Sequence, residues 1–158
     1  IDGQKTGLTS KAMTSPCGKI HIPLNESKDN QSQIVEYLNE YRGEGIQHIA
    51  LYTEDIYKTV DVLKARNVPL QDTIDTYYDL IDDRIDEHDE NVEELRKRRI
   101  LIDGGKEDGI LLQIFTDTVI GPIFFEIIQR KGNNGFGEGN FKALFESIEL
   151  DQIKRGII

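Results

Sequence analysis

Apolar residues at alternating and helical spacings divide the start of the chain into a strand and a helix. Residues 18–24 alternate isoleucine and leucine with polar residues, which predicts a strand that ends in a turn beginning at Pro23. A polar loop over 27–32 follows. Apolar residues at helical spacing between 34 and 41 then predict a helix that Gly43 stops.

A second and longer run of elements begins near residue 46. Residues 46–52 predict a strand, and Thr53 is placed to cap a helix whose apolar face carries Ile56 and Val60. Residues 70–99 are dense in acidic and basic side chains. This stretch predicts one or two surface helices whose charges form a solvated face.

The third part of the chain is predicted to hold strands and then a loop and a helix. The three predicted strands cover residues 100–103, 110–116 and 123–129. The glycine-rich loop 104–109 joins the first two as a hairpin. A glycine loop over 132–139 follows, and Asn140 is placed to cap a last helix.

These elements predict an α+β fold that holds one complete module. Residues 46–129 give a βαβββ unit with the charged insertion 70–99, which is too small to close a barrel by itself. Such a unit would pair with a second copy. Residues 1–45 show only the last strand of that copy, 18–24, and a connecting helix, while 130–158 form the glycine loop and C-terminal helix.

Composition and charge exclude several classes of partner. The chain has 29 acidic and 19 basic residues, a formal net charge of -10, so its field repels nucleic acid. No apolar run approaches the ~20 residues that cross a bilayer, so no membrane partner is expected. The single cysteine, Cys17, points to a reducing cytoplasm. The chain begins at Ile1 without an initiator Met, and we expect it to be a piece of a longer protein.

Two polar residues occupy positions where apolar strands normally have none. Alternation places His48 on the same face as Ala50, and Glu126 on the same face as Phe124 and Ile128. A carboxylate buried there without a partner costs several kcal/mol, so it needs a cation. A divalent metal satisfies it, as does a hydrogen-bonded Arg or Tyr. A purely structural role for either residue remains open at this point.

Imidazole and carboxylate ligands are typical of the site with two His and one carboxylate that binds non-haem Fe(II). A second His is hard to find. His21 alternates onto the polar side of its strand, and His88 lies among acidic residues where a solvated side chain is expected. Gln113 lies in an apolar strand and needs a hydrogen-bond partner. The glycines of 135–139 resemble a phosphate loop only superficially, so a hinge before the last helix is the better interpretation.

Several ordered motifs resemble one enzyme family, the 4-hydroxyphenylpyruvate dioxygenases, and most closely its bacterial members. The resemblance runs over nearly the whole chain and is weakest at 67–99. Its motifs are Thr6-Gly7-Leu8-Thr9-Ser10-Lys11-Ala12-Met13, Ile22-Pro23-Leu24-Asn25-Glu26, Gly43-Glu44-Gly45-Ile46-Gln47-His48-Ile49-Ala50, Leu111-Leu112-Gln113-Ile114-Phe115, Gly121-Pro122-Ile123-Phe124-Phe125-Glu126-Ile127-Ile128-Gln129-Arg130 and Gly135-Phe136-Gly137-Glu138-Gly139-Asn140-Phe141-Lys142-Ala143-Leu144-Phe145.

The resemblance implies a fold of paired βαβββ modules of the vicinal oxygen chelate type. It implies conversion of 4-hydroxyphenylpyruvate and O2 to homogentisate and CO2 in tyrosine catabolism, with one Fe(II) per subunit. His48 and Glu126 match two of the three iron ligands. The family's first ligand, a His, would lie before Ile1. The isolated chain is therefore expected to lack one ligand and to be inactive.

The resemblance also assigns pocket residues. Gln113 is expected beside the iron, and the last helix is expected to act as a lid that the glycine loop allows to move. Gln113 and Gln47 are assigned catalytic roles. The polar wall of the substrate site matches Ser10, Asn25, Gln33 and Gln47, and the aromatic walls match Phe115, Phe141 and Phe145.

Two alternative functions stay open. Hydroxymandelate synthase shares the fold, iron site and substrate, and only the product separates it from the dioxygenase. The chain by itself could instead be a non-catalytic module that binds metal or ligand. The complete family members are expected to be homo-oligomers. Exposed strand edges of an incomplete barrel also favour self-association of this chain.

Overall fold

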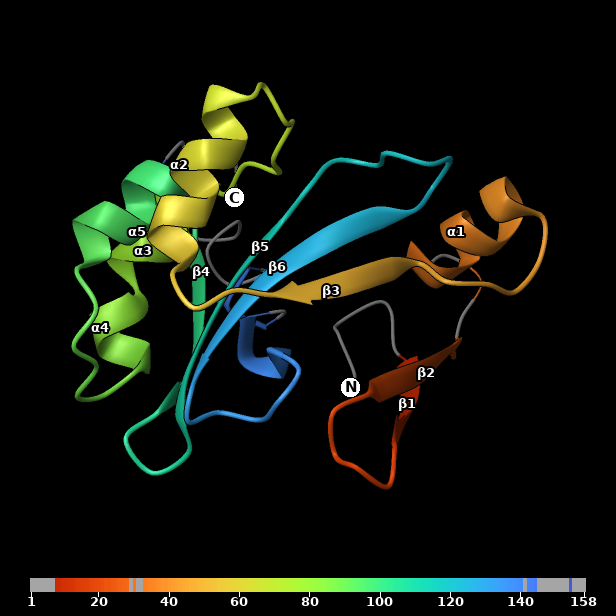
Figure 1. Cartoon of the computed structure of the whole chain (residues 1–158), viewed down its shortest axis with the longest axis horizontal. Coiled ribbons are helices and arrows are strands. Elements are labelled where there is room, and N and C mark those ends of the chain that lie inside the picture. The colour runs from red at the N-terminus through yellow and green to blue at the C-terminus, as the bar shows by residue number, and fades with distance from the viewer. Residues whose placement is uncertain (1–7, 29, 31–32, 141, 145–153, 155–158) are drawn as a thin grey trace. The chain divides into compact units, whose positions relative to one another are not determined.

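A computed structural model describes residues 8–28, 30, 33–140, 142–144 and 154 (Figure 1). The chain separates into two compact units, residues Ile1–Gln47 and His48–Ile158. Among the described residues, no helix is both long enough and apolar enough to cross a membrane.

The first unit holds a two-stranded antiparallel sheet of β1 (Leu8–Thr14) and β2 (His21–Ser27), followed by helix α1 (Gln33–Tyr41). The predicted helix is confirmed. The predicted strand bounds are wrong, because β2 continues through Pro23 to Ser27, and β1 was not predicted at all. Pro23 lies opposite Ala12 in a sheet whose strands each have one open edge, where a missing N–H is tolerated. β1 is largely polar and exposed, so it carries no alternating apolar signal.

The second unit is built on a four-stranded sheet in the order β3-β6-β5-β4. β3 and β6 run parallel, and the other neighbours are antiparallel. The strands are β3 (His48–Tyr52), β4 (Leu101–Gly105), β5 (Gly109–Phe115) and β6 (Phe124–Lys131). Helix α2 (Ile56–Ala65) connects β3 to the insertion. The predicted βαβββ order and the hairpin at 104–109 are therefore present. Asp55, rather than Thr53, caps α2, because its carboxylate accepts from the Lys58 amide.

The charged insertion forms three short helices, α3 (Asp75–Asp79), α4 (Ile81–Arg84) and α5 (Val92–Arg98). With α2 they gather on one side of the sheet (Figure 1). Tyr77, Ile81 and Leu95 are fully or almost fully buried in the core of the unit. The predicted solvated face therefore holds for the charged residues of the segment and not for these three, and the predicted number of helices, one or two, is wrong because the segment forms three. Its few apolar residues are divided among three short helices, so no long helical stripe marks them in the sequence.

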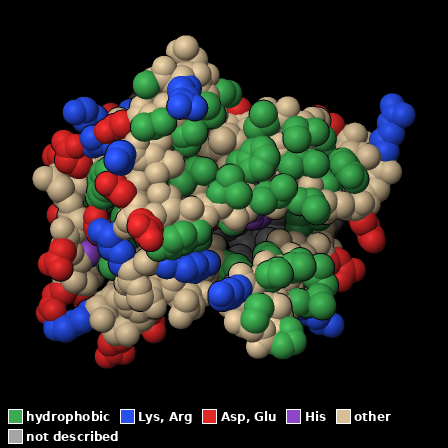
Figure 2. Space-filling view, in the orientation of Figure 1, with side chains coloured by type: hydrophobic (Ala, Val, Ile, Leu, Met, Phe, Trp, Pro, Cys, Tyr) green, Lys and Arg blue, Asp and Glu red, His purple; other side chains and the backbone are tan. Residues whose placement is uncertain are grey.

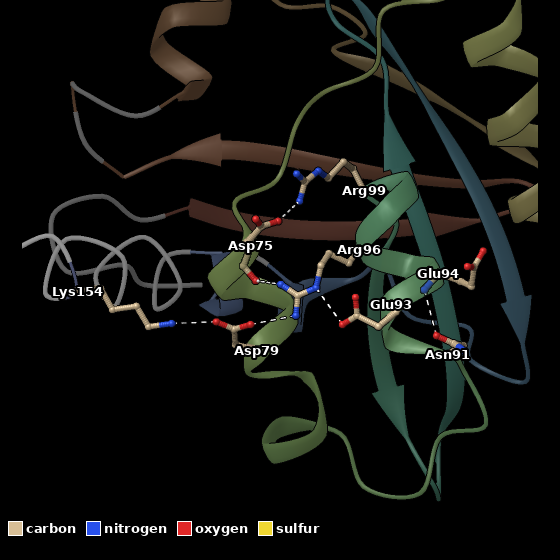
Figure 3. Close-up of polar contacts among 8 residues, drawn as sticks. All are labelled: Asp75, Asp79, Asn91, Glu93, Glu94, Arg96, Arg99 and Lys154. Carbon is tan, nitrogen blue, oxygen red and sulfur yellow. Dashed lines mark hydrogen bonds and ion pairs between the residues drawn. The ribbon is translucent and has the colours of Figure 1, made fainter.

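Charged side chains cover the outside of these helices (Figure 3). Arg96 donates to the Asp75 carbonyl at 2.9 Å, to Asp79 at 3.0 Å and to Glu93 at 3.2 Å. Asp79 also accepts from Lys154 at 2.9 Å. Exposed pairs of this kind are each worth ~0–1 kcal/mol, so the buried apolar residues, and not the charges, hold the insertion in place.

Two further sequence predictions are wrong. The side chain of His88 is only 5% exposed, and its Nε2 lies 3.1 Å from the Asp82 carboxylate, so it is not solvated. Asn140 does not cap the last helix, because helical residues begin at 138. Its side chain is instead buried, and its Oδ1 accepts from the Tyr77 hydroxyl at 2.6 Å. The Tyr77–Asn140 hydrogen bond joins residues 63 apart in the sequence, whereas the His88–Asp82 pair forms within the insertion.

Candidate active site

One face of the second unit's sheet gathers several of the polar residues singled out from the sequence. In the β3–β6 register, His48 lies opposite Phe124 and Ala50 lies opposite Glu126. In the β5–β6 register, Phe115 lies opposite Glu126. Paired residues point to the same face of a sheet, so His48, Glu126 and Phe115 share one face.

His48 and Glu126 converge across this face. The His48 Nε2 lies 3.7 Å from the Glu126 Oε2, and the two side chains are 28% and 8% exposed. Phe124 stacks on the His48 imidazole with ring centroids 5.1 Å apart and planes 16° apart. The stacked ring holds the imidazole so that one nitrogen faces the carboxyl.

Burial favours the uncharged form of both groups. It raises the pKa of Glu126 from its ordinary 4.5 to about 7, while Arg130 acts in the opposite direction. It also lowers the pKa of His48. A neutral imidazole is the form that binds metal. A carboxylate with so little solvation gains most from a divalent cation placed between the two groups.

The donor chemistry therefore fits a metal bound by one imidazole and one carboxylate. In the part of the chain that the structure describes, no group of three or more His, Cys, Asp or Glu side chains is placed to hold a metal. The chain has three histidines. His21 is hydrogen-bonded to Thr14 and to the Gly18 carbonyl, and His88 is paired with Asp82. The site thus brings together two candidate ligands, His48 from β3 and Glu126 from β6.

Phe124 is a residue of the candidate site that sequence reasoning did not single out. Besides stacking on His48, it contacts Phe115 edge-on, with ring centroids 5.9 Å apart. The two rings form an apolar wall beside the ligand pair. In the sequence, Phe124 lies two residues before Glu126 and therefore on the same face of the strand. This spacing alone does not distinguish a phenylalanine that lines a site from one that packs in the core.

Gln113 lies on the same face of β5 as Phe115, two residue pairs along the sheet from the Phe115–Glu126 pair. Gln113 pairs with Ile128, so it is a diagonal neighbour of Glu126 at a spacing of about 7–8 Å between Cα atoms. It is only 3% exposed, and its Oε1 has no hydrogen-bond partner among the described residues. The expectation that this amide needs a partner is thus not met within the described protein.

The remaining predicted site residues differ in exposure, and some have side chains outside the described part of the chain. Ser10 and Asn25 lie opposite each other on β1 and β2, and both are exposed. Gln47 ends the first unit, immediately before β3, and is half-buried. The residues whose side chains lie outside the described part of the chain are Gln33, Phe141 and Phe145.

Comparisons with known proteins agree with this architecture. The model of the Glyoxalase/Bleomycin resistance protein/Dioxygenase superfamily matches residues 1–109, more than half of the chain. The chain belongs to this superfamily. The match confirms the α+β fold of the vicinal oxygen chelate type that the sequence predicted, and the second unit has the predicted βαβββ order of elements.

Several relatives in sequence are named 4-hydroxyphenylpyruvate dioxygenase. A 4-hydroxyphenylpyruvate dioxygenase of Pseudomonas aeruginosa and a protein named Hemolysin VllY of Vibrio vulnificus are each 67% identical over 100% of the chain. The chain spans 44% of the length of each. A solved variant of 4-hydroxymandelate synthase from Streptomyces coelicolor has a TM-score of 0.78 and 35% identity, over 96% of this chain and 44% of that one.

Proposed function

We propose that the chain is the part of a 4-hydroxyphenylpyruvate dioxygenase that supplies two of its Fe(II) ligands. The observation that carries the proposal is the convergence of His48 and Glu126, 3.7 Å apart, on a face walled by phenylalanine. The 67% identical dioxygenase of Pseudomonas aeruginosa supports the choice of substrate, 4-hydroxyphenylpyruvate, and of product, homogentisate.

Each residue of the face has a distinct task in this proposal. His48 and Glu126 hold the metal, and the bound Fe(II) supplies binding of the keto acid and activation of O2. Phe115 and Phe124 keep water from the reacting atoms. The Gln113 amide is placed to make a hydrogen bond with bound substrate. The third ligand, a His, comes from the part of the relatives that this chain does not cover.

Substrate orientation completes the proposal. Ser10, Asn25, Gln33 and Gln47 provide the polar groups that orient the substrate, and Phe141 and Phe145 provide further aromatic wall. The whole enzyme is proposed to act in the cytoplasm in tyrosine catabolism and to assemble as a homo-oligomer. These assignments rest on the family resemblance of the motifs that contain the residues.

Oxygen uptake tests the proposal. The 158-residue chain is assayed with Fe(II) and 4-hydroxyphenylpyruvate, both alone and joined to the part of the Pseudomonas aeruginosa relative that it does not cover. We expect uptake with homogentisate from the joined protein and none from the chain alone. Glu126→Gln keeps the side-chain shape but removes the charge, and we expect loss of more than about 100-fold in kcat.

His21→Gln is the matched control, because His21 lies on the exposed β2 strand, and we expect it to retain full uptake. Uptake by the chain alone would overturn the assignment of the third ligand. Formation of 4-hydroxymandelate in place of homogentisate would assign the chain to the synthase, which the solved relative represents. If the joined protein takes up no oxygen and forms neither product, the proposed activity is overturned.

A further inference from the structure

The glycine loop after β6 is tied to the sheet at both of its ends. Arg130 donates to the carbonyl oxygens of Asn133 at 3.0 Å and Gly135 at 2.7 Å. Further along, the Gly139 amide donates to the Asp103 carboxylate at 2.9 Å. Between these anchors the backbone passes directly over the site face of β5.

Gly137 is the point of closest approach. Its φ is +76°, in the left-handed region that glycine adopts without cost. A Cβ built there would lie 2.1 Å from the Gln113 Oε1 and 2.9 Å from the Gln113 Cδ. Both separations are far inside van der Waals contact. The space that a side chain at 137 would fill is therefore occupied by the Gln113 amide.

The same amide is the unsatisfied polar group of the site. Its Oε1 is buried without a hydrogen-bond partner among the described residues, which leaves the desolvation of that oxygen uncompensated. A buried amide kept at this cost, and packed under a glycine, indicates a group held in one orientation for a ligand. In the β5–β6 register it lies two residue pairs from the Phe115–Glu126 pair, on the same face.

We propose that Gly137 is a positioning residue of the active site, which by lacking a side chain lets the Gln113 amide lie under the glycine loop and face the bound substrate. The inference rests on the proposed function for the identity of that substrate. The contact between Gly137 and Gln113 is present in this chain without substrate, so it does not depend on the proposed function. The glycine loop thus fixes the position of the Gln113 side-chain amide and also connects β6 to the last helix.

Gly137→Ala tests the contact, and Gly121→Ala is its control. Gly121 also has a positive φ, +55°, but a Cβ there would meet nothing within 4 Å. Both variants therefore carry the backbone cost of alanine in the left-handed region, and only Gly137→Ala displaces the amide. Thermal midpoints of the two variants in a Gln113→Ala background, where no amide is displaced, show whether this backbone cost is matched.

Activity is measured in the joined protein as a double-mutant cycle. We expect Gly137→Ala to lower kcat/KM by about tenfold or more and Gly121→Ala to change it by less than about twofold. In a Gln113→Ala background, Gly137→Ala should have almost no further effect, because the displaced group is absent. An equal loss in that background would overturn the inference, since the loop would then act by strain alone.

A measurement without turnover separates this inference from the proposed activity. The side-chain amide signals of Gln113 are followed by NMR in the 158-residue chain and assigned by their loss in Gln113→Ala. We expect Gly137→Ala to shift them and Gly121→Ala to leave them in place. Unchanged Gln113 signals in Gly137→Ala overturn the inference. A shift together with no oxygen uptake by the joined protein supports the contact and overturns only the proposed activity.

Discussion

A carboxyl group buried against phenylalanine is stable only in its neutral form or beside a cation. Glu126 is 6% exposed, and the nearest ionisable partner on its face is an imidazole that burial itself keeps neutral. Without metal, Glu126 therefore favours the protonated state up to a pH of about 7. Metal binding has to displace that proton, so affinity for a divalent ion should increase as the pH rises through this range.

The stability of the metal-free chain should depend on this group. The pKa of Glu126 is about 7 in the folded chain and has its ordinary value of 4.5 in the unfolded chain. Below about pH 4.5 the carboxyl is neutral in both states, so it costs no stability. The free energy of unfolding then falls as the pH rises through about 7, because only the unfolded chain ionises this group without cost. We expect Glu126→Gln to be more stable than the unsubstituted chain by on the order of 3 kcal/mol at about pH 8, with the difference vanishing near pH 4.

Urea unfolding with a chelator present, at several pH values, measures this difference. Exposed Glu107, in the hairpin loop, provides the control Glu107→Gln, which should show no such pH-dependent gain. A constant difference between Glu126→Gln and the unsubstituted chain from about pH 4 to about pH 8 would contradict the prediction. Addition of Fe(II) or Zn2+ should remove the advantage of the glutamine variant at the higher pH.

At the scale of elements, sequence patterns predicted most of the second unit and failed for its insertion. β3, β5 and β6 carry apolar residues in short runs, and α2 has an apolar stripe, so local pattern was sufficient. Residues 75–98 form three helices of four to seven residues, each too short to show a periodic stripe. Their position was decided by burial of Tyr77, Tyr78 and Leu95 in the common core.

The insertion should therefore contribute to global stability. Leu95 is 0% exposed, so Leu95→Ala should lower the free energy of unfolding by about 2–5 kcal/mol, through lost burial and the cavity left behind. Leu51, which is 47% exposed, gives a control of the same type, and Leu51→Ala should cost less than about 1 kcal/mol. Equal small losses in both variants would mean that the insertion is a separate surface element. Chemical denaturation decides between the outcomes.

At the scale of the whole molecule, an apolar surface remains at the sheet's edge. Ile49, Leu51 and Tyr52 on β3 are 42%, 47% and 65% exposed. In the described part of the chain, β3 pairs with β6 on one side and with no strand on the other. Hydrophobic side chains gather over this region in Figure 2. An open, apolar strand edge is a surface that favours association.

The 158-residue chain should therefore self-associate. Sedimentation at increasing concentration is expected to show a rising mean mass. Leu51→Lys should weaken the association by at least about tenfold, because a charge would have to be buried at the strand edge. Val119→Lys, at an equally exposed position between β5 and β6, should leave it unchanged. A single monomeric species at all concentrations would show that the β3 edge does not drive pairing.

The sequence by itself predicted two candidate metal ligands, His48 and Glu126, and the βαβββ module that carries them. Alternation within a strand is a local property, so His48 and Glu126 could each be assigned to an apolar face from their immediate neighbours. Only the tertiary structure decided that the two faces are one, because the β3–β6 pairing joins strands more than 70 residues apart in the chain. The hydrogen bond between Tyr77 and Asn140 and the close approach of Gln113 to Gly137 likewise join residues that lie far apart in the chain. No local pattern of polar and apolar residues encodes such contacts, since each is fixed by where a distant segment packs.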